Sequence, residues 1–269
     1  MFDRIFRVGP LARSESVNSE LQTRLRKFYT NYAAPYFEGI EGDMYFFYNL
    51  IKPDLLRLLN ERGKILALDL GAGRTNFPSW LETVGVRDKV FVTAQDVTDA
   101  NLEHLNRHCD RSFVGDVREM QSEFDFIVST FAYEHLVFPQ KTLTHCLDML
   151  TPGGILYIVS PCYTLLGYLP PALRHLPRWK QFGLNLFLVA SSALVRVLGR
   201  PLFWIVTDPA VFHLPFRRDY DAIHMVSKSD LDSFMRGHCQ SLPIMLPKAT
   251  GQGRVWLRFM MLIVAYCKR

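Results

Sequence analysis

The chain has 269 residues, of which 49% are hydrophobic, and its net charge is +5. This length and hydrophobic fraction are enough for one large domain with a substantial core. The five cysteines form no Cys-x-x-Cys pair, which argues against a zinc knuckle and a disulfide framework. The first residues lack the long apolar core of a signal peptide, and the longest apolar stretch, 182–195, is too short to span a bilayer comfortably. We therefore expect a cytoplasmic protein.

Two helices are predicted ahead of the first strand. The first covers about residues 16–36 and places Leu21, Leu25 and Phe28 on one face at helical spacing. The second covers residues 43–60. Neither segment contains an obvious catalytic motif.

From residue 65 onward, short apolar strands alternate with helices. The strand candidates are 65–70, 90–95, 112–114, 124–129 and 155–160, and the helices between them are 76–84, 100–107 and 139–150. Such alternation predicts parallel strands joined by right-handed crossovers. Ligands of sheets of this kind bind at the C-terminal ends of the strands.

The alternation stops over residues 162–218. This segment holds nine aromatic residues, seven basic residues and one acid, whereas the rest of the chain has a net charge of −1. The positive charge therefore belongs to one segment, and no motif for reading nucleic-acid bases accompanies it. A helix is expected at 183–198 within the segment. A helix at 227–236 and strands at 242–246 and 257–266 complete the predicted order.

The most informative stretch is residues 68–76, LDLGAGRTN, at the end of the first strand. Gly71 and Gly73 let the backbone approach a ligand closely, since no Cβ stands in the way. The helix that follows would present free N–H groups at its positive end. A dinucleotide-binding turn needs a third glycine, which is missing here, and the P-loop pattern is absent too. The turn therefore favours a different adenosine-bearing ligand.

Acidic residues follow the next two strands. Asp96 ends the second strand, and its carboxylate, which only accepts hydrogen bonds, suits the two hydroxyl groups of a ribose. Asp116 follows the third strand and could accept the exocyclic amine of adenine, with Val117 packing on the ring.

Taken together, residues 65–161 resemble the core of a class I S-adenosylmethionine-dependent methyltransferase. LDLGAGRT, AQDV, GDV, FDFIVSTFAYEHL and LTPGGILYIVSP match the family's motifs in order and spacing, with Thr75 in place of one glycine. The resemblance implies an α/β fold with a Rossmann-like, seven-stranded, mostly parallel sheet whose last strand is antiparallel. It also implies S-adenosylmethionine as the cofactor. We expect an N-terminal helical cap at 1–62 and a methyltransferase domain at 63–269, with a helical lid inserted after the fifth strand at about 162–218.

The resemblance also implies a set of cofactor-binding residues at the ends of successive strands. They are Asp69, Gly71, Ala72, Gly73, Thr75, Asp96, Val97, Asp116, Val117, Thr130 and Phe131. In this family pattern, Asp69 organises the glycine turn and holds the methionine ammonium through water. Thr130 and Phe131 match the floor under the sulfonium.

His135 and His224 are the candidate catalytic residues. Methyl transfer is an in-line SN2 reaction on an activated sulfonium, so alignment can supply a large rate factor. A general base is needed when the acceptor must lose a proton, as a hydroxyl does, and histidine suits that role near neutral pH. His135 follows the fourth strand, close to where the methyl group should lie. No metal is expected, because Phe131 stands where metal-using relatives have an acid.

The expected acceptor is a small molecule or a lipid-like compound, with oxygen as the expected site of methylation. The 162–218 segment would line a pocket for an apolar acceptor or lie on an anionic membrane as a peripheral contact. An RNA or protein methyltransferase is the enzymatic alternative, although STFAYEH lacks the N/D-P-P-Y/F signature of base N-methylation. A non-catalytic cofactor-binding partner subunit is the other alternative, against which the nearly complete motif set argues. No specific nucleic acid is predicted, and the oligomeric state is left open.

Overall fold

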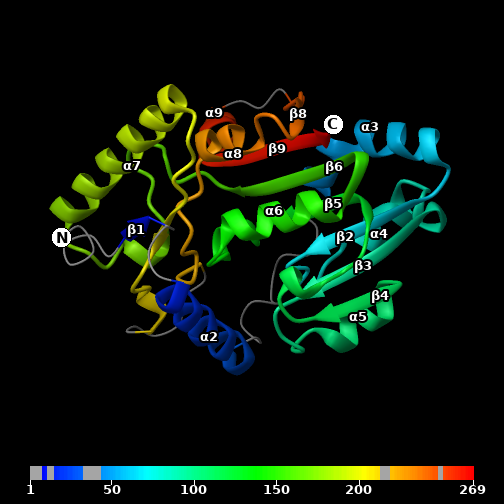
Figure 1. Cartoon of the computed structure of the whole chain (residues 1–269), viewed down its shortest axis with the longest axis horizontal. Coiled ribbons are helices and arrows are strands. Elements are labelled where there is room, and N and C mark those ends of the chain that lie inside the picture. The colour runs from blue at the N-terminus through cyan, green and yellow to red at the C-terminus, as the bar shows by residue number, and fades with distance from the viewer. Residues whose placement is uncertain (1–7, 11–14, 33–43, 213–218, 248–250) are drawn as a thin grey trace.

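The computed structural model describes residues 8–10, 15–32, 44–212, 219–247 and 251–269. Its centre is a seven-stranded sheet with the strand order β4-β3-β2-β5-β6-β9-β8 (Figure 1). The strands are β2 (Ile65–Leu70), β3 (Val90–Asp96), β4 (Arg111–Val114), β5 (Phe124–Thr130), β6 (Leu150–Pro161), β8 (Cys239–Leu242) and β9 (Met261–Lys268). The five strands predicted between residues 65 and 160 are all present.

Strands β2 to β6 pair in parallel, and β9 runs antiparallel between β6 and β8. The register places Leu70 beside Gln95 and Asp69 beside Val128. The C-terminal ends of β2, β3 and β5 therefore meet at one edge of the sheet. This arrangement confirms the predicted Rossmann-like fold with its last strand antiparallel.

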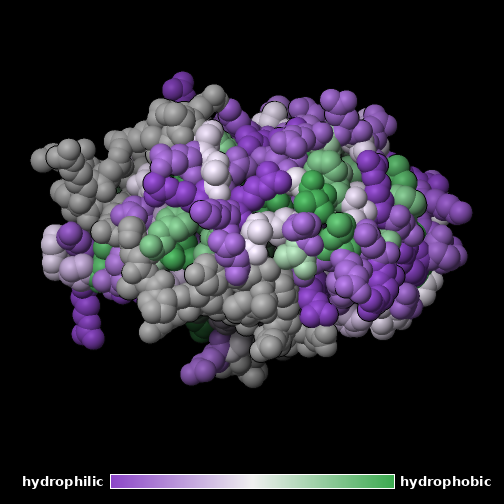
Figure 2. Space-filling model, turned by 90° about the horizontal axis from the view of Figure 1, so that it is seen from below, coloured by the Kyte–Doolittle hydropathy of each residue, from purple (hydrophilic) through white to green (hydrophobic). Residues whose placement is uncertain are grey.

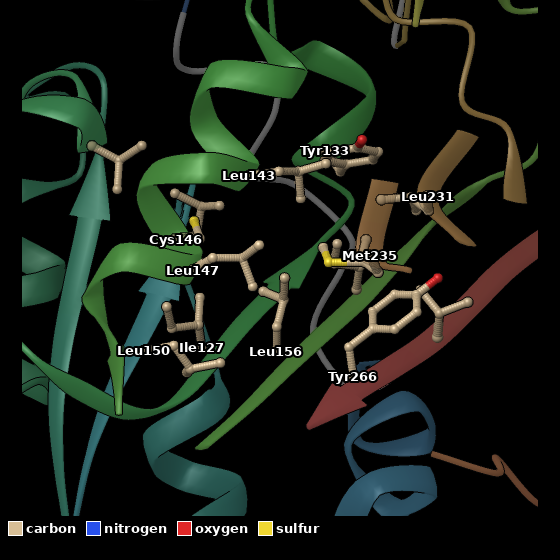
Figure 3. Packing of buried hydrophobic residues seen from close by; sticks show 14 of the residues in the cluster. Ile127, Tyr133, Leu143, Cys146, Leu147, Leu150, Leu156, Leu231, Met235 and Tyr266 are labelled. Atoms are coloured by element: carbon tan, nitrogen blue, oxygen red, sulfur yellow. The ribbon is translucent and has the colours of Figure 1, made fainter. Parts of the chain in front are cut away.

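Helices cover both faces of the sheet. They are α3 (Met44–Arg62), α4 (Phe77–Thr83), α5 (Leu102–His108), α6 (Pro139–Met149) and α8 (Lys228–Met235). Successive strand residues point to opposite faces, so Phe126 packs in the cluster of α3 and α4, whereas Ile127 packs in the cluster of α6 and α8. Figure 3 shows the cluster of α6 and α8, in which Leu147 of α6 and Met235 of α8 lie on either side of Leu156 of β6.

A third cluster joins the N-terminal segment to the insertion after β6. Its main elements are α2 (Glu15–Tyr32), α7 (Arg178–Leu198) and β7 (Trp204–Val206), and the strand β1 (Val8–Pro10) adjoins β7. β1 pairs with β7 in an antiparallel ladder, and Leu21, Leu25 and Phe28 of α2 pack with Leu184 and Leu188 of α7 in one hydrophobic cluster. We call these four elements the cap. It lies beside the C-terminal edge of the parallel strands (Figure 1).

Shorter helical pieces connect the main elements. Single 3-10 turns occur at Arg87–Lys89, Val117–Glu119, Tyr133–His135, Pro171–Leu173 and Ala210–Phe212. On the face seen from below, the residues that the structure describes are mainly hydrophilic, with hydrophobic side chains gathered in a few small groups (Figure 2). The predicted first helix extended to residue 36, and its last four residues lie outside the described part of the chain.

The C-terminal elements differ from the prediction. The strand expected at 242–246 instead lies at Cys239–Leu242, because Pro243 cannot donate to a strand ladder. Residues expected to form a turn and the start of the last strand are helical, as α9 (Gly251–Val255) and a π-helical turn (Trp256–Met260). β9 begins only at Met261, where its pairing with Pro161 at the end of β6 begins.

Candidate active site

A cavity of about 310 Å³ lies at the C-terminal ends of the parallel strands. Ten of the predicted cofactor-binding residues line it: Gly71, Ala72, Gly73, Thr75, Asp96, Val97, Asp116, Val117, Thr130 and Phe131. Asp69 does not line the cavity and lies behind the glycine turn, 1% exposed. The topology thus brings together residues that are up to sixty positions apart in the sequence.

The glycine turn after β2 is held by the end of β3. The N–H of Gly71 donates to Gln95 Oε1 at 3.1 Å, and the N–H of Gly73 donates to Asp96 Oδ2 at 3.0 Å. Both glycines have positive φ, +67° and +54°. A Cβ on Gly71 would lie 2.5 Å from the Cβ of Ala132, whereas a Cβ on Gly73 would meet no atom within 4 Å. Gly73 therefore leaves open space on the cavity side of the turn.

The side chain of Gln95 bridges two turns of the site, a role that the sequence did not predict. Besides accepting from Gly71, it donates from Nε2 to the Gly115 carbonyl oxygen at 2.7 Å. It thereby links the turn after β2 to the turn after β4. Its position beside Asp96 in the AQDV motif was the only signal, and that signal does not distinguish a bridging amide from an ordinary strand residue.

Asp69 carries a buried carboxylate oxygen, Oδ2, that has no hydrogen-bond partner among the described residues. Burial raises the pKa of Asp69 to about 7, with an opposing hydrogen bond from Thr75. A buried acceptor without a partner is costly and calls for a donor. A water or a cationic group bound near the glycine turn would satisfy it.

Asp96 and Asp116 occupy different environments on the cavity wall. Asp96 accepts hydrogen bonds from the N–H groups of Gly73 and Thr98, and burial raises its pKa. Asp116 accepts from Gln22 Nε2 at 2.6 Å and forms an ion pair with Arg118 at 2.5 Å. Burial raises the pKa of Asp116, but these bonds from Arg118 and Gln22 outweigh it and lower the pKa overall. Asp116 therefore tethers α2 to the sheet as well as facing the cavity.

Helix α2 forms the outer wall of the cavity. Its residues Gln22, Leu25, Arg26 and Tyr29 line the space at a helical spacing of three or four residues. The sequence predicted the helix, but hydrophobic periodicity alone does not show which other element its face covers. The contact between Gln22 and Asp116 spans 94 positions in the chain, so no local pattern encodes it.

At the other end of the cavity, His135 forms an ion pair with a buried acid. Its Nδ1 lies 3.0 Å from Oδ2 of Asp221, whose side chain is 1% exposed. The hydroxyl of Tyr29 donates to the same oxygen at 2.6 Å. Burial lowers the pKa of His135, but the charge and hydrogen bond of Asp221 raise it to about 10. The ion pair with Asp221 therefore favours the imidazolium form of His135, and an imidazolium cannot accept a proton, which argues against the predicted general-base role.

His224 lies outside the cavity. It is fully buried, with its Nδ1 3.3 Å from the carbonyl oxygen of Tyr133 and its ring packed edge-on against the Tyr133 ring at 4.7 Å. Burial lowers the pKa of His224 to about 3. The structure contradicts the predicted catalytic role, because no acceptor can reach this ring. His224 instead packs behind the 3-10 turn that carries His135.

Thr130 and Phe131 close the cavity floor at the end of β5. Phe131 adopts a left-handed conformation with φ +53°, and its N–H donates to the Val159 carbonyl oxygen at 2.8 Å. Its ring packs edge-on against Phe47 of α3 at 5.3 Å. The backbone of this floor is therefore fixed from both sides. No group of three or more potential metal-ligating side chains occurs among the described residues.

A family model described as a methyltransferase domain matches residues 45–236, well over half of the chain. The chain belongs to this family. Family membership and fold confirm the resemblance to class I methyltransferases, and with it the enzyme class and S-adenosylmethionine as the cofactor. A search of curated proteins finds no match.

Several solved structures are similar in fold to this chain, although their sequence identity to it is low. The plantazolicin methyltransferase BpumL, in complex with a triazolic desmethylPZN analog and S-adenosylhomocysteine, has a TM-score of 0.55 and 12% identity over 95% of this chain and 100% of that chain. The Burkholderia thailandensis 1,6-didemethyltoxoflavin-N1-methyltransferase, with bound 1,6-didemethyltoxoflavin and S-adenosylhomocysteine, has a TM-score of 0.53 and 15% identity over 97% of this chain and 94% of that chain. These likenesses show the fold alone.

The cavity's residues fit S-adenosylmethionine. The unpartnered oxygen of Asp69 suits an ammonium group near the glycine turn, and Asp96 presents a carboxylate to the cavity for hydroxyl donors. Gly73 supplies space for close approach to the backbone. Two carboxylates, Asp69 and Asp96, and the open space at Gly73 match a ligand that carries an amine and a ribose.

Proposed function

We propose that the methyltransferase transfers the methyl group of S-adenosylmethionine to the oxygen of a small, largely apolar or lipid-like acceptor with an acidic hydroxyl group. The observation that carries this proposal is the charged pair of His135 and Asp221 at the cavity wall. Because His135 is protonated at neutral pH, it favours an acceptor that arrives as an oxygen anion. A phenol, an enol or a carboxylic acid fits this requirement.

The cavity wall around this charge favours an apolar acceptor body. Leu25 of α2 and Leu136, Val137 and Phe138 of the segment after β5 line the same cavity as His135. Apolar walls with few polar groups are typical of small-molecule sites. An acceptor with a ring or chain against these residues and an acidic oxygen toward His135 would satisfy both parts of the wall.

The cofactor, when bound, supplies a methyl group on a sulfonium that is activated for in-line displacement. The chain's own residues then align the acceptor and stabilise its anionic oxygen. The imidazolium of His135 lowers the free energy of that anion by charge and by hydrogen bonding. Asp221 keeps His135 protonated, and Tyr29 holds Asp221 from α2. No general base is required, because the acceptor has already lost its proton.

The first test is cofactor binding. S-adenosylhomocysteine should raise the melting temperature, because a ligand that binds only the folded state stabilises it. Asp96→Asn should reduce that rise, since the carboxamide keeps the size of the side chain but replaces one acceptor with a donor. An unchanged melting temperature at millimolar ligand would refute the cofactor assignment to this cavity.

The second test is acceptor choice. The enzyme should methylate phenols, enols and carboxylic acids that are ionised at the assay pH and should leave matched neutral alcohols and amines unmodified, as measured by S-adenosylhomocysteine release. His135→Gln should lower kcat/KM for these acceptors but keep the melting shift with S-adenosylhomocysteine. The exposed His238 lies outside the cavity, so His238→Gln is the matched control and should retain full activity. A preference for amines would contradict the proposed acceptor, and ligand binding without turnover on any acceptor would favour a non-catalytic role.

A further inference from the structure

Helix α7 exposes a continuous apolar stripe to solvent. The stripe consists of Trp179, Phe182, Leu186, Leu194 and Val197, which are between 44% and 82% exposed. Their spacing of three, four, eight and three residues places them on one side of the helix. We call these five residues the α7 outer stripe. A contiguous exposed apolar surface of this kind marks an interaction site.

The opposite side of α7 packs against the rest of the protein and forms hydrogen bonds with it. Asn185 donates to the carbonyl oxygens of Leu165 and Tyr168, and Ser192 Oγ lies 2.9 Å from Ser229 Oγ of α8. Leu184 packs in the cap cluster with the residues of α2. Within the described residues, α7 alone is long and apolar enough to cross a membrane by length and composition, with 33% of its apolar window buried. Because one side of α7 is buried against the protein and hydrogen-bonded to it, we expect the helix to lie on a membrane rather than span it.

Basic residues stand at both ends of the stripe. Arg178 and Lys180 lie in the first turn of α7, and Arg196 and Arg200 lie at or just beyond its last turn. The helix contains no aspartate or glutamate. Apolar side chains between two cationic ends complement a bilayer with anionic headgroups, in which the stripe meets the acyl chains and the basic groups meet the phosphates. A second copy of this chain is a poorer partner, because an antiparallel pair would bring cationic ends together.

We propose that the α7 outer stripe docks the methyltransferase on the surface of an anionic lipid bilayer, with the axis of α7 parallel to the membrane plane. The stripe lies on the cap, which also supplies the outer wall of the cavity through α2. Docking would therefore hold the cap at the membrane and leave the sheet outside it. The proposal depends on α7 alone and stands whatever the acceptor is.

Vesicle flotation tests the proposal on the full chain. The protein should float with vesicles of phosphatidylcholine mixed with phosphatidylglycerol, and should remain in solution with vesicles of phosphatidylcholine alone. High salt should weaken the binding, because exposed charges are screened. Trp179→Glu combined with Phe182→Glu should lower the partition coefficient by at least about tenfold, since two aromatic side chains lose their insertion. Arg178→Gln combined with Arg200→Gln should lower it by roughly fivefold for each charge removed.

Phe91 provides the matched control. It is 46% exposed on β3, toward the opposite end of the sheet from the cavity. Phe91→Glu adds one negative charge at a distant apolar site, as Trp179→Glu alone does on the stripe, and it should float normally. All variants should keep the melting shift with S-adenosylhomocysteine, which shows that they fold and separates this test from that of the cofactor site. Equal flotation of the stripe variant and the native protein would overturn the proposal. A concentration-dependent dimer that the stripe variant abolishes, without binding to vesicles, would assign the stripe to self-association instead.

Discussion

Replacing Gly73 with alanine should weaken cofactor binding more than it weakens the fold. The residue has φ +54°, so an alanine there costs about 1–2 kcal/mol of stability from left-handed backbone strain. The new Cβ meets no protein atom within 4 Å, and Gly73 lines the cavity, so we expect the methyl group to compete with the cofactor for space. Overpacking against a tightly fitting group costs about 1–3 kcal/mol, which corresponds to roughly a 5- to 150-fold rise in the Kd for S-adenosylhomocysteine.

Two other glycines separate these effects. Gly85 has φ +75°, meets nothing within 4 Å and lies away from the cavity, so Gly85→Ala should lose similar stability and keep the native Kd. Gly71→Ala should be the least stable of the three, because its Cβ would lie 2.5 Å from the Cβ of Ala132. Urea unfolding measures stability, and isothermal titration calorimetry measures Kd. The reasoning fails if Gly73→Ala binds S-adenosylhomocysteine as tightly as Gly85→Ala does.

Three further predictions concern charged groups around the cavity. Affinity for S-adenosylhomocysteine, measured by calorimetry, should rise with pH through about 7 as Asp69 ionises, because the ammonium group of the ligand favours the carboxylate. Asp69→Asn should flatten this pH profile. An identical slope in the variant would exclude Asp69 as the group that titrates. The pKa of His135 is raised to about 10, so its pairing with Asp221 stabilises the fold fully below pH 6.5 and is lost as the pH rises through 10. Asp221→Asn should remove that alkaline loss in urea unfolding, and unchanged alkaline behaviour would refute the pairing. Gln22→Ala should lower the free energy of unfolding by about 1.5–3 kcal/mol through loss of its bond to Asp116, and an unaltered value would show that this tether is not stabilising.

The sheet and the glycine turn were predictable because their signals are local. Each strand between residues 65 and 160 is a short apolar run, and the alternation with helices fixes the parallel order through the handedness of the crossovers. Asp96 and Thr130 are the last residues of two such strands, so their convergence at one edge follows from topology. The register then places them around one cavity without further information from the chain.

The protonation of His135 was not predictable from its neighbours in sequence. Its partner Asp221 lies 86 positions further along the chain, in a segment that runs beside the turn carrying His135, where the N–H of His224 donates to the Glu134 carbonyl oxygen. The same holds for Gln22 and Asp116, which join α2 to the turn after β4. His224 presented a different difficulty, because the sequence around it is compatible both with a catalytic base and with a buried core residue. Burial alone decides between the two, and burial is a property of the packed fold.

The pairing of β1 with β7 ties the N-terminal segment to the insertion after β6. The cap is built from two chain segments nearly two hundred positions apart, Val8–Pro10 and Trp204–Val206. By contrast, α3 packs against the sheet and belongs to its core. A chimera that exchanges only the insertion would leave β1 and α2 facing a foreign surface. The cap can therefore be exchanged between such proteins only if both segments move together, with the exchange point placed before α3 rather than at the start of the sheet.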